Sequence, residues 1–214
     1  MKKEILINSY KAGACHISSA LSCIDILVDI FKQKKEDDIF LFGKASGVAA
    51  YYCLLAEQGE IPKGKVAYYL KNYPLVSKEV PGVVHSFGSI GHSLSVAAGI
   101  AFADRKRNVY VLISDGELME GSTYEAALFI GQHNLKNLYV HVDDNKLVAL
   151  GKTKDILNLD NAFEFYQKNI PNFIRHETIK GAGVDFMEND YTWHYKNLDE
   201  NLLEKALEQI RQLR

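Results

Sequence analysis

Short apolar runs alternate along this chain with longer segments of helical periodicity. The runs are rich in β-branched and aromatic residues, as buried strands are, and they occupy residues 38–43, 109–113, 138–142 and 173–178. Helices are predicted over residues 18–33, 49–58, 93–106, 122–133 and 200–213, with Ser18 as the N-cap of the first. This alternation is typical of an α/β fold, in which helices cover both faces of a mainly parallel sheet.

The length and charge of the chain indicate how many domains it forms and which partners are not expected. The chain has 214 residues and no linker, repeat or low-complexity segment divides it, so a single domain over residues 1–214 is predicted. The formal net charge is −2, which gives no electrostatic reason to expect nucleic acid or an anionic membrane as a partner. The sequence also shows no signal peptide and no apolar run long enough to span a bilayer.

The three cysteines, Cys15, Cys23 and Cys53, are odd in number and lack the spacing of a zinc site. We interpret them as reduced thiols, which favours a cytoplasmic location. Cys23 and Cys53 fall in apolar helical patterns and are expected in the core. Cys15 and His16 are not expected to form a nucleophile pair, because adjacent residues do not face each other on a helix.

The segment ISDGELMEG, at residues 113–121, places three carboxylates directly after a predicted strand: Asp115, Glu117 and Glu120. Buried carboxylates are costly unless a cation, a proton or a hydrogen-bond donor satisfies them. Asn145 follows the next predicted strand, thirty positions after Asp115. The helix between the two strands forms a βαβ crossover, so the carboxyl ends of the strands can converge where ligands bind in such sheets.

A carboxylate and an amide oxygen, with a backbone carbonyl nearby, form the oxygen-rich set that Mg²⁺ or Ca²⁺ prefers. Mg²⁺ is usually completed by phosphates and waters, so a diphosphate ligand fits this need. Simpler interpretations remain open, since Asp115 could cap the following helix and Asn145 could be a turn residue. Glu117 is interpreted as a solvated or capping carboxylate. No role is assigned to His85, His133, His141 or His176.

Four segments, in order, resemble one enzyme family. Asp115-Gly116 followed by Asn145 resembles the thiamine diphosphate-binding motif, and the flanking residues resemble its transketolase version: DGELMEGSTYEAA and VDDNKLVALG. Three further blocks resemble other transketolase segments: KAGACHISSALSCIDIL, VPGVVHSFGSIGHSLSVAAGIAFA and ETIKGAGVDFMENDYTWH. The resemblance covers almost the whole chain. It implies the N-terminal, diphosphate-binding domain of transketolase, with a three-layer α/β/α fold and a mainly parallel sheet.

The resemblance also implies roles for individual residues. Asp115, Asn145 and the Leu147 carbonyl would bind the metal, Mg²⁺ or Ca²⁺. The cofactor thiamine diphosphate would contact Gly88, Ile90, Ser114, Asp115, Gly116 and Asn145. The residues placed near the reacting carbon or in the carboxylate network between paired active sites are His16, His92, His194 and Glu120. Either of His16 and His194 could instead be a structural histidine.

Several positions depart from the family pattern. Ser46 and Tyr73 stand where the family has histidines, Ala182 replaces a lysine, and Tyr195 and Ser114 stand where glycine is common. Because the missing histidines belong to the environment of the cofactor and the donor ketose, we expect an altered donor or acceptor. A specialised sugar or secondary-metabolite pathway is favoured over housekeeping pentose phosphate metabolism.

The resemblance implies a reaction and a partner. The expected reaction transfers a two-carbon ketol unit from a ketose or ketose phosphate to an aldehyde. In this superfamily a glutamate on a separate pyrimidine-binding domain activates the cofactor, so we expect a second subunit to supply it, in an α2β2 heterotetramer; this chain should be inactive without that partner. Two alternatives remain: another thiamine diphosphate enzyme, either deoxyxylulose-phosphate-synthase-like or using an α-keto acid, and a non-catalytic scaffold subunit.

Overall fold

The structure, a computed structural model, describes residues 1–212 of the chain. Its sheet consists of β1 (Ile39–Phe42), β2 (Val109–Ser114), β3 (Leu138–Asp144) and β4 (Asn172–Glu177), in the order β1-β2-β3-β4. All neighbouring strands are parallel. The predicted α/β class is therefore confirmed, and each strand lies within two residues of its predicted run.

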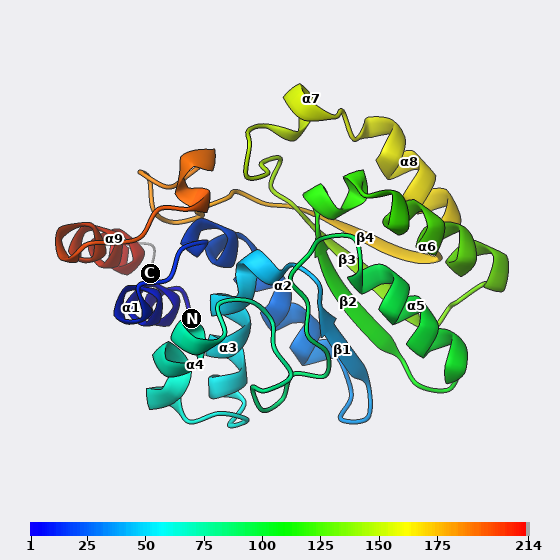
Figure 1. Cartoon of the computed structure of the whole chain (residues 1–214), viewed down its shortest axis with the longest axis horizontal. Coiled ribbons are helices and arrows are strands. Elements are labelled where there is room, and N and C mark those ends of the chain that lie inside the picture. Colours follow the sequence, from blue (N-terminus) through cyan, green and yellow to red (C-terminus); the bar gives the residue numbers. More distant parts are fainter. Residues whose placement is uncertain (213–214) are drawn as a thin grey trace.

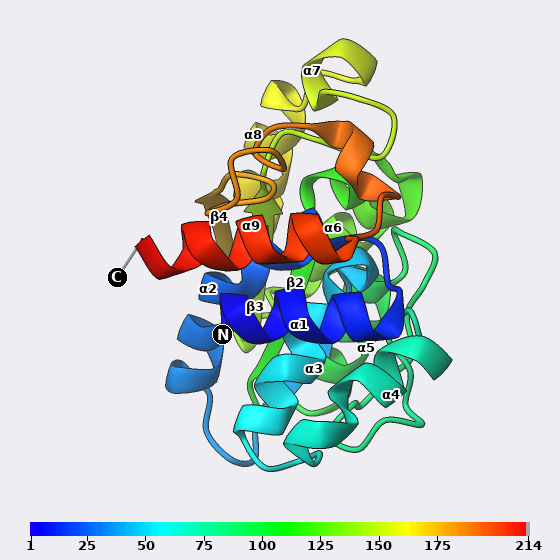
Figure 2. The same cartoon turned by 90° about the vertical axis from the view of Figure 1, so that its left-hand side faces the viewer.

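Helices cover both faces of this sheet (Figure 1). One layer contains α5 (Ser93–Ala103), α6 (Gly121–His133) and α8 (Asp160–Asn169). The opposite layer contains α2 (Ile17–Gln33), against which α3 (Val48–Glu57) packs. The outer helices are α1 (Lys2–Ala12), α4 (Val66–Asn72), α7 (Thr153–Ile156) and α9 (Glu200–Gln212). Figure 2 shows α1 and α9 side by side in the foreground, as their contacts also indicate.

Small side chains explain how α5 approaches the sheet closely. Ala97, Ala98 and Ala101 of α5 are buried, and α5 packs against β2, whose Val109 and Val111 are also buried. Burying such an apolar surface is the main stabilising contribution in a three-layer fold. The expectation that Cys23 and Cys53 belong to the core is confirmed, since both are buried. Within residues 1–212, no helix combines the length and apolar character needed to cross a membrane.

Some helix boundaries differ from prediction. The N-cap of α2 is His16, not Ser18, because the chain turns into the helix through a left-handed residue at His16, with φ 63°. Helix α5 ends at Ala103, where Asp104 adopts an extended conformation. The predicted end of the last helix, residue 213, lies outside the described residues. Helices α1, α4, α7 and α8 were not predicted, because they are short or bury few apolar positions.

The strand register decides which residues meet at the carboxyl edge of the sheet. Ser114 at the end of β2 lies beside Asp143 of β3, and Asp143 lies beside His176 of β4. The segments that follow β2 and β3 therefore leave the sheet side by side. This arrangement brings Asp115 and Asn145 to the same edge, as the βαβ interpretation of the sequence predicts.

A pair of histidines, one buried and one half-buried, lies below that edge. His141 Nδ1 and His176 Nε2 are 2.9 Å apart, and their rings are stacked. His141 is buried and its Nε2 has no hydrogen-bond partner among the described residues. Burial, with a smaller contribution from His176, lowers the pKa of His141 from 6.5 to about 4. Burial also lowers the pKa of His176.

This pair predicts a loss of stability in acid. The folded state favours neutral His141, so its contribution is complete above pH 6.5 and is lost as the pH falls toward about 4. The difference between pH 7 and pH 5 is expected to be about 2 kcal/mol in the free energy of unfolding. Urea unfolding at both pH values should show a smaller difference in His141→Phe than in the wild type. The exposed His85→Phe should keep the wild-type difference, and an unchanged pH dependence in His141→Phe would contradict the assignment.

Candidate functional site

A cavity of about 460 Å³ opens at the carboxyl edge of the sheet. It is lined by these predicted site residues: His16, Gly88, Ile90, Ser114, Asp115, Gly116, Glu120, Leu147 and His194. Asn145 lies just behind it and lines an adjoining hollow that shares Leu147. His92 is exposed at the start of α5 and is not among the lining residues. The structure therefore gathers most of the predicted site, and the role of His92 remains a prediction.

Asp115 begins the 3₁₀ helix η3 (Asp115–Met119), and only 1% of its surface is exposed. One carboxylate oxygen accepts the N–H of Gly116 at 2.8 Å, and the other accepts the N–H of Lys146 at 2.7 Å. Burial is the main cause that raises the pKa of Asp115 to about 6. The second bond joins the segment after β2 to the loop after β3. A desolvated carboxylate at such a junction is strongly stabilised by a bound cation.

Glu117 is buried, so the prediction that it is solvated was wrong and the capping alternative is confirmed. Its two oxygens accept hydrogen bonds from the Ser93 hydroxyl at 2.8 Å and from the Ser114 N–H at 2.9 Å. Ser114 and Glu117 together form the capping box of η3. The cap of this turn is therefore made by other residues than Asp115, which weakens the alternative in which Asp115 serves only as a cap.

The loop after β3 supplies two more oxygen atoms. Asn145 is buried, and its side-chain oxygen accepts the N–H of Leu147 at 3.1 Å. The carbonyl oxygen of Leu147 accepts a hydrogen bond from the Lys180 ammonium at 3.1 Å. The Lys180 ammonium therefore brings positive charge to this carbonyl. A carboxylate, an amide oxygen and a backbone carbonyl fit Mg²⁺ that is completed by a diphosphate.

Gly116 fits the close packing of this turn. A Cβ atom at Gly116 would lie 3.0 Å from Cγ1 of Val148, a contact so tight that the Val148 side chain would have to shift. Within residues 1–212, no group of three or more His, Cys, Asp or Glu side chains could hold a metal ion.

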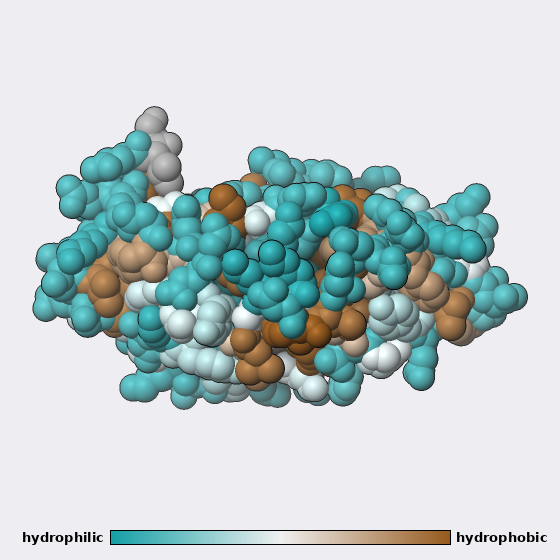
Figure 3. Space-filling model, turned by 90° about the horizontal axis from the view of Figure 1, so that it is seen from above, coloured by the Kyte–Doolittle hydropathy of each residue, from teal (hydrophilic) through white to brown (hydrophobic). Residues whose placement is uncertain are grey.

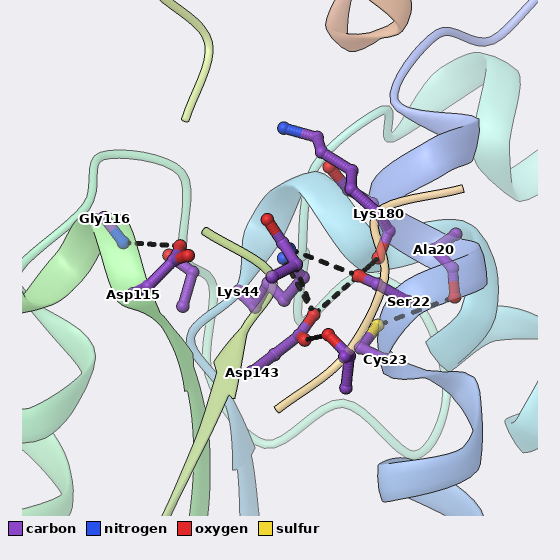
Figure 4. A network of polar contacts seen from close by, with 12 residues as sticks. Ala20, Ser22, Cys23, Lys44, Asp115, Gly116, Asp143 and Lys180 are labelled. Carbon is purple, nitrogen blue, oxygen red and sulfur yellow. Dashed lines mark hydrogen bonds and ion pairs between the residues drawn. The ribbon is translucent and has the colours of Figure 1, made fainter. Parts of the chain in front are cut away.

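Two buried lysines do not emerge from the sequence interpretation (Figure 4). Lys44 follows β1 and pairs with Asp143 at 3.1 Å, both side chains being almost fully buried. Burial acts to lower the pKa of Lys44, but Asp143 offsets this and the pKa is raised. Burial lowers the pKa of Lys180 to about 8, so it remains largely charged at neutral pH. The only sequence signal is a lysine in a short apolar, glycine-flanked segment, in LFGKAS and TIKGAG.

His16 and His194 lie together on one wall of the cavity. Their ring centroids are 4.6 Å apart in an edge-to-face arrangement, and the His16 N–H donates to the His194 carbonyl at 3.2 Å. The ammonium of Lys180 lies 3.2 Å from Nδ1 of His194. Burial, then Lys180 and His16, lowers the pKa of His194 to about 3, and burial with Lys180 lowers that of His16. Both rings are therefore neutral near pH 7 and can donate or accept a hydrogen bond.

Cys15 contacts His16, contrary to the sequence expectation. Its thiol lies 3.4 Å from His16 Nδ1; both residues precede the first turn of α2, where His16 has a left-handed backbone, so the helical spacing assumed from the sequence does not apply. Burial raises the pKa of the Cys15 thiol, which is the opposite of what a nucleophilic thiolate needs. The structure therefore supports no nucleophile pair here.

The comparisons with known proteins agree with this geometry. Residues 74–170 match the family model described as transketolase, thiamine diphosphate binding domain. One of the subunits of an apulose-4-phosphate transketolase from Actinobacillus succinogenes is 33% identical, over 98% of this chain and 92% of that protein. The chain belongs to the transketolase family. It is part of a transketolase-type transferase and carries the thiamine diphosphate-binding domain.

Other transketolases match this chain over most of its length but over different shares of their own. The corresponding subunit of an apulose-4-phosphate transketolase from Phocaeicola vulgatus is 30% identical, over 98% of this chain and 90% of that protein. Human transketolase is 27% identical over 93% of this chain, but the match spans only 39% of the human protein. The transketolase structure from Campylobacter jejuni superposes with a TM-score of 0.89 at 21% identity, over 98% of this chain and 41% of that one.

The structure also places two positions that depart from the transketolase pattern. Ser46 lines the cavity beside Lys44, whereas Tyr73 ends α4, packs against the core and does not line the cavity. Of these two positions, Ser46 is therefore the one that can change what the cavity holds.

Proposed function

We propose that this chain is the diphosphate-binding subunit of a split transketolase, folded as a single domain. A second subunit with the pyrimidine-binding domain completes the site, and the assembled enzyme moves a two-carbon ketol unit from a ketose phosphate to an aldehyde. The observation that carries the proposal is the convergence of Asp115, Asn145 and the Leu147 carbonyl beside the Lys180 ammonium. Two relatives that match nearly end to end are each named as one subunit of a transketolase, which supports a separate partner.

When bound, thiamine diphosphate supplies the reactive carbon for cleaving and forming the carbon–carbon bond. Asp115, Asn145 and the Leu147 carbonyl would hold Mg²⁺, and Lys180 would add positive charge for the diphosphate. Neutral His16 and His194 would orient substrate oxygens by hydrogen bonds without adding net charge to the cavity. Glu120 lines the same cavity and is proposed to contact the carboxylate network of the partner.

The mouth of the cavity is unusually apolar for an exposed surface. Its lining includes Leu75, Ile90, Leu150 and Ile156, all substantially exposed, with Leu150 at 81%. Figure 3, seen from the side of α7, shows hydrophobic residues gathered near the middle of this face. Exposed apolar patches of this kind mark interaction sites. We propose that the partner subunit covers this rim and excludes water from the cavity.

Leu150→Asp is expected to weaken assembly with the partner by at least about 10-fold, because a charge would be buried where the partner covers the apolar rim. Analytical ultracentrifugation of the two subunits measures this. Leu128→Asp is a matched control, since Leu128 is also exposed but lies on α6, away from the cavity lining. Equal assembly of both variants with the partner would show that the rim is not the interface.

The substrate proposal follows the relatives and the cavity. Apulose 4-phosphate, named in two relatives, is the first donor to test. Ser46 in place of a family histidine supports a donor other than that of housekeeping transketolases. The test is turnover of apulose 4-phosphate, xylulose 5-phosphate and pyruvate with aldehyde acceptors, using this chain together with its partner. Ketol transfer from a sugar phosphate is expected, whereas turnover of pyruvate alone would favour the α-keto-acid alternative, and no turnover of any donor would favour a scaffold.

A further inference from the structure

Asp143 at the end of β3 is fully buried and lies at the centre of a polar cluster (Figure 4). Four side chains direct polar hydrogens at its two oxygens: Ser22 at 2.6 Å, Lys44 at 3.1 Å, Asn145 at 3.5 Å, and Thr178. These residues come from α2 and from the segments that follow β1, β3 and β4. A single carboxylate thus contacts every segment that forms this part of the carboxyl edge except the one after β2.

The cluster determines which way the Asn145 amide faces. An ionised carboxylate only accepts hydrogen bonds, so Asp143 requires the NH₂ group of Asn145 on its side. Ser22 also requires the NH₂ group of Asn145 on its side. Its hydroxyl donates to Asp143 or to the Ser19 carbonyl, so its oxygen can only accept a hydrogen bond from Asn145, at 3.4 Å. A flipped amide would place its oxygen against two acceptors.

The opposite end of the amide consequently presents its oxygen. That oxygen accepts the Leu147 N–H, and the N–H of the intervening Lys146 donates to Asp115, so the same short loop carries the Asn145 oxygen and contacts the Asp115 carboxylate. Cations are bound by the oxygen of an amide side chain and not by its nitrogen. The orientation of the Asn145 amide therefore decides whether its oxygen is available to a cation together with the Asp115 carboxylate and the Leu147 carbonyl.

We propose that Asp143 is a positioning residue for the cation site: it holds the Asn145 amide with its oxygen toward the cation, in addition to neutralising Lys44. The inference rests on the proposed function, because it requires Mg²⁺ with thiamine diphosphate at this edge. Loss of an outer partner of a metal ligand commonly lowers metal affinity 10- to 100-fold. Asp143→Asn should therefore lower Mg²⁺ affinity roughly 10- to 100-fold, since an amide at this position no longer fixes the orientation of its neighbour.

Exchanging the side chains of Asp143 and Asn145 distinguishes the loss of amide orientation from a general loss of structure. In the double variant Asp143→Asn, Asn145→Asp, the amide donates to the carboxylate, and a carboxylate offers an oxygen to the cation in either orientation. Mg²⁺ affinity should recover to within about 5-fold of the wild type. Thr178→Val is the matched control: it removes a donor to the other Asp143 oxygen, so it should lower stability while leaving Mg²⁺ affinity within about 3-fold.

The measurement is calorimetric titration of Mg²⁺ in the presence of thiamine diphosphate, with the full chain and its partner, and urea unfolding in parallel. The wild-type titration tests the proposed function, and absence of binding there would overturn both proposals. With wild-type binding established, equal losses of affinity in Asp143→Asn and Thr178→Val would overturn the positioning role. If Asp143→Asn alone does not fold, the exchange decides, and its failure to restore both folding and affinity would overturn the inference.

Discussion

Replacing Asp115 with alanine is expected to lower the affinity for Mg²⁺ with thiamine diphosphate by more than about 100-fold. Removing a residue that only holds a metal ligand costs about 10- to 100-fold, and removing the ligand itself should cost more. Asp115 is the one carboxylate in the proposed metal set, and its oxygens also hold Gly116 and Lys146 in place. Its removal takes away a negative charge and the link between the two loops. Calorimetric titration of the chain with its partner measures the loss directly.

Asp144→Asn is the matched control for this prediction. Asp144 is also a buried carboxylate at the end of β3, but it faces Arg175, with contacts of 2.6 and 2.8 Å. This variant should lose stability while its cofactor affinity stays within about 3-fold of the wild type, since Asp144 lies outside the oxygen set. If Asp115→Ala bound the cofactor as tightly as Asp144→Asn does, the proposed metal site would be wrong.

Lys44→Met is expected to lower the free energy of unfolding by roughly 3–5 kcal/mol. The substitution removes one member of a buried ion pair and leaves the Asp143 carboxylate without its cation in a low-dielectric environment. Urea unfolding measures the change. Adding Asp143→Asn should recover part of the loss, because the unpaired charge is then gone.

Lys63→Met provides the comparison for Lys44. Lys63 also pairs with a carboxylate, Glu57, at 2.7 Å, but both side chains are largely exposed. An exposed pair of this kind contributes little to stability, so its removal should leave the unfolding curve nearly unchanged. A similar, small effect of Lys44→Met would show that Asp143 is satisfied by its other three donors.

The fold was predictable because its signal is local. β1, β2 and β3 are short runs rich in apolar, β-branched and aromatic residues, and the parallel pairing of β2 with β3 agrees with a crossover through the single helix α6. The helices that were not predicted carry weak patterns: α1 buries only four residues, Ile5, Leu6, Asn8 and Ser9. The position of α1 depends on packing against α4 and α9, which the sequence does not display.

The candidate site was predictable only in part. Asp115 and Asn145 follow strands, so their convergence can be inferred from topology. Lys44 and Lys180 carry no comparable pattern, and their burial depends on partners far away in the sequence. A glutamate in a turn is usually exposed, which is why the sequence favours a solvated Glu117. Its buried carboxylate accepts a hydrogen bond from Ser93, 24 positions away, which the sequence does not indicate.

The contacts of Asp143 also bear on how the chain folds. Ser22 and Asp143 are 121 positions apart, and Thr178 lies 35 positions beyond Asp143. Contacts of such high sequence separation cannot form until long loops have closed, and proteins dominated by them fold slowly. The cofactor edge is therefore expected to become organised late, after the sheet itself, so a newly synthesised chain acquires a binding-competent edge only once β4 and the segment after it have joined the sheet.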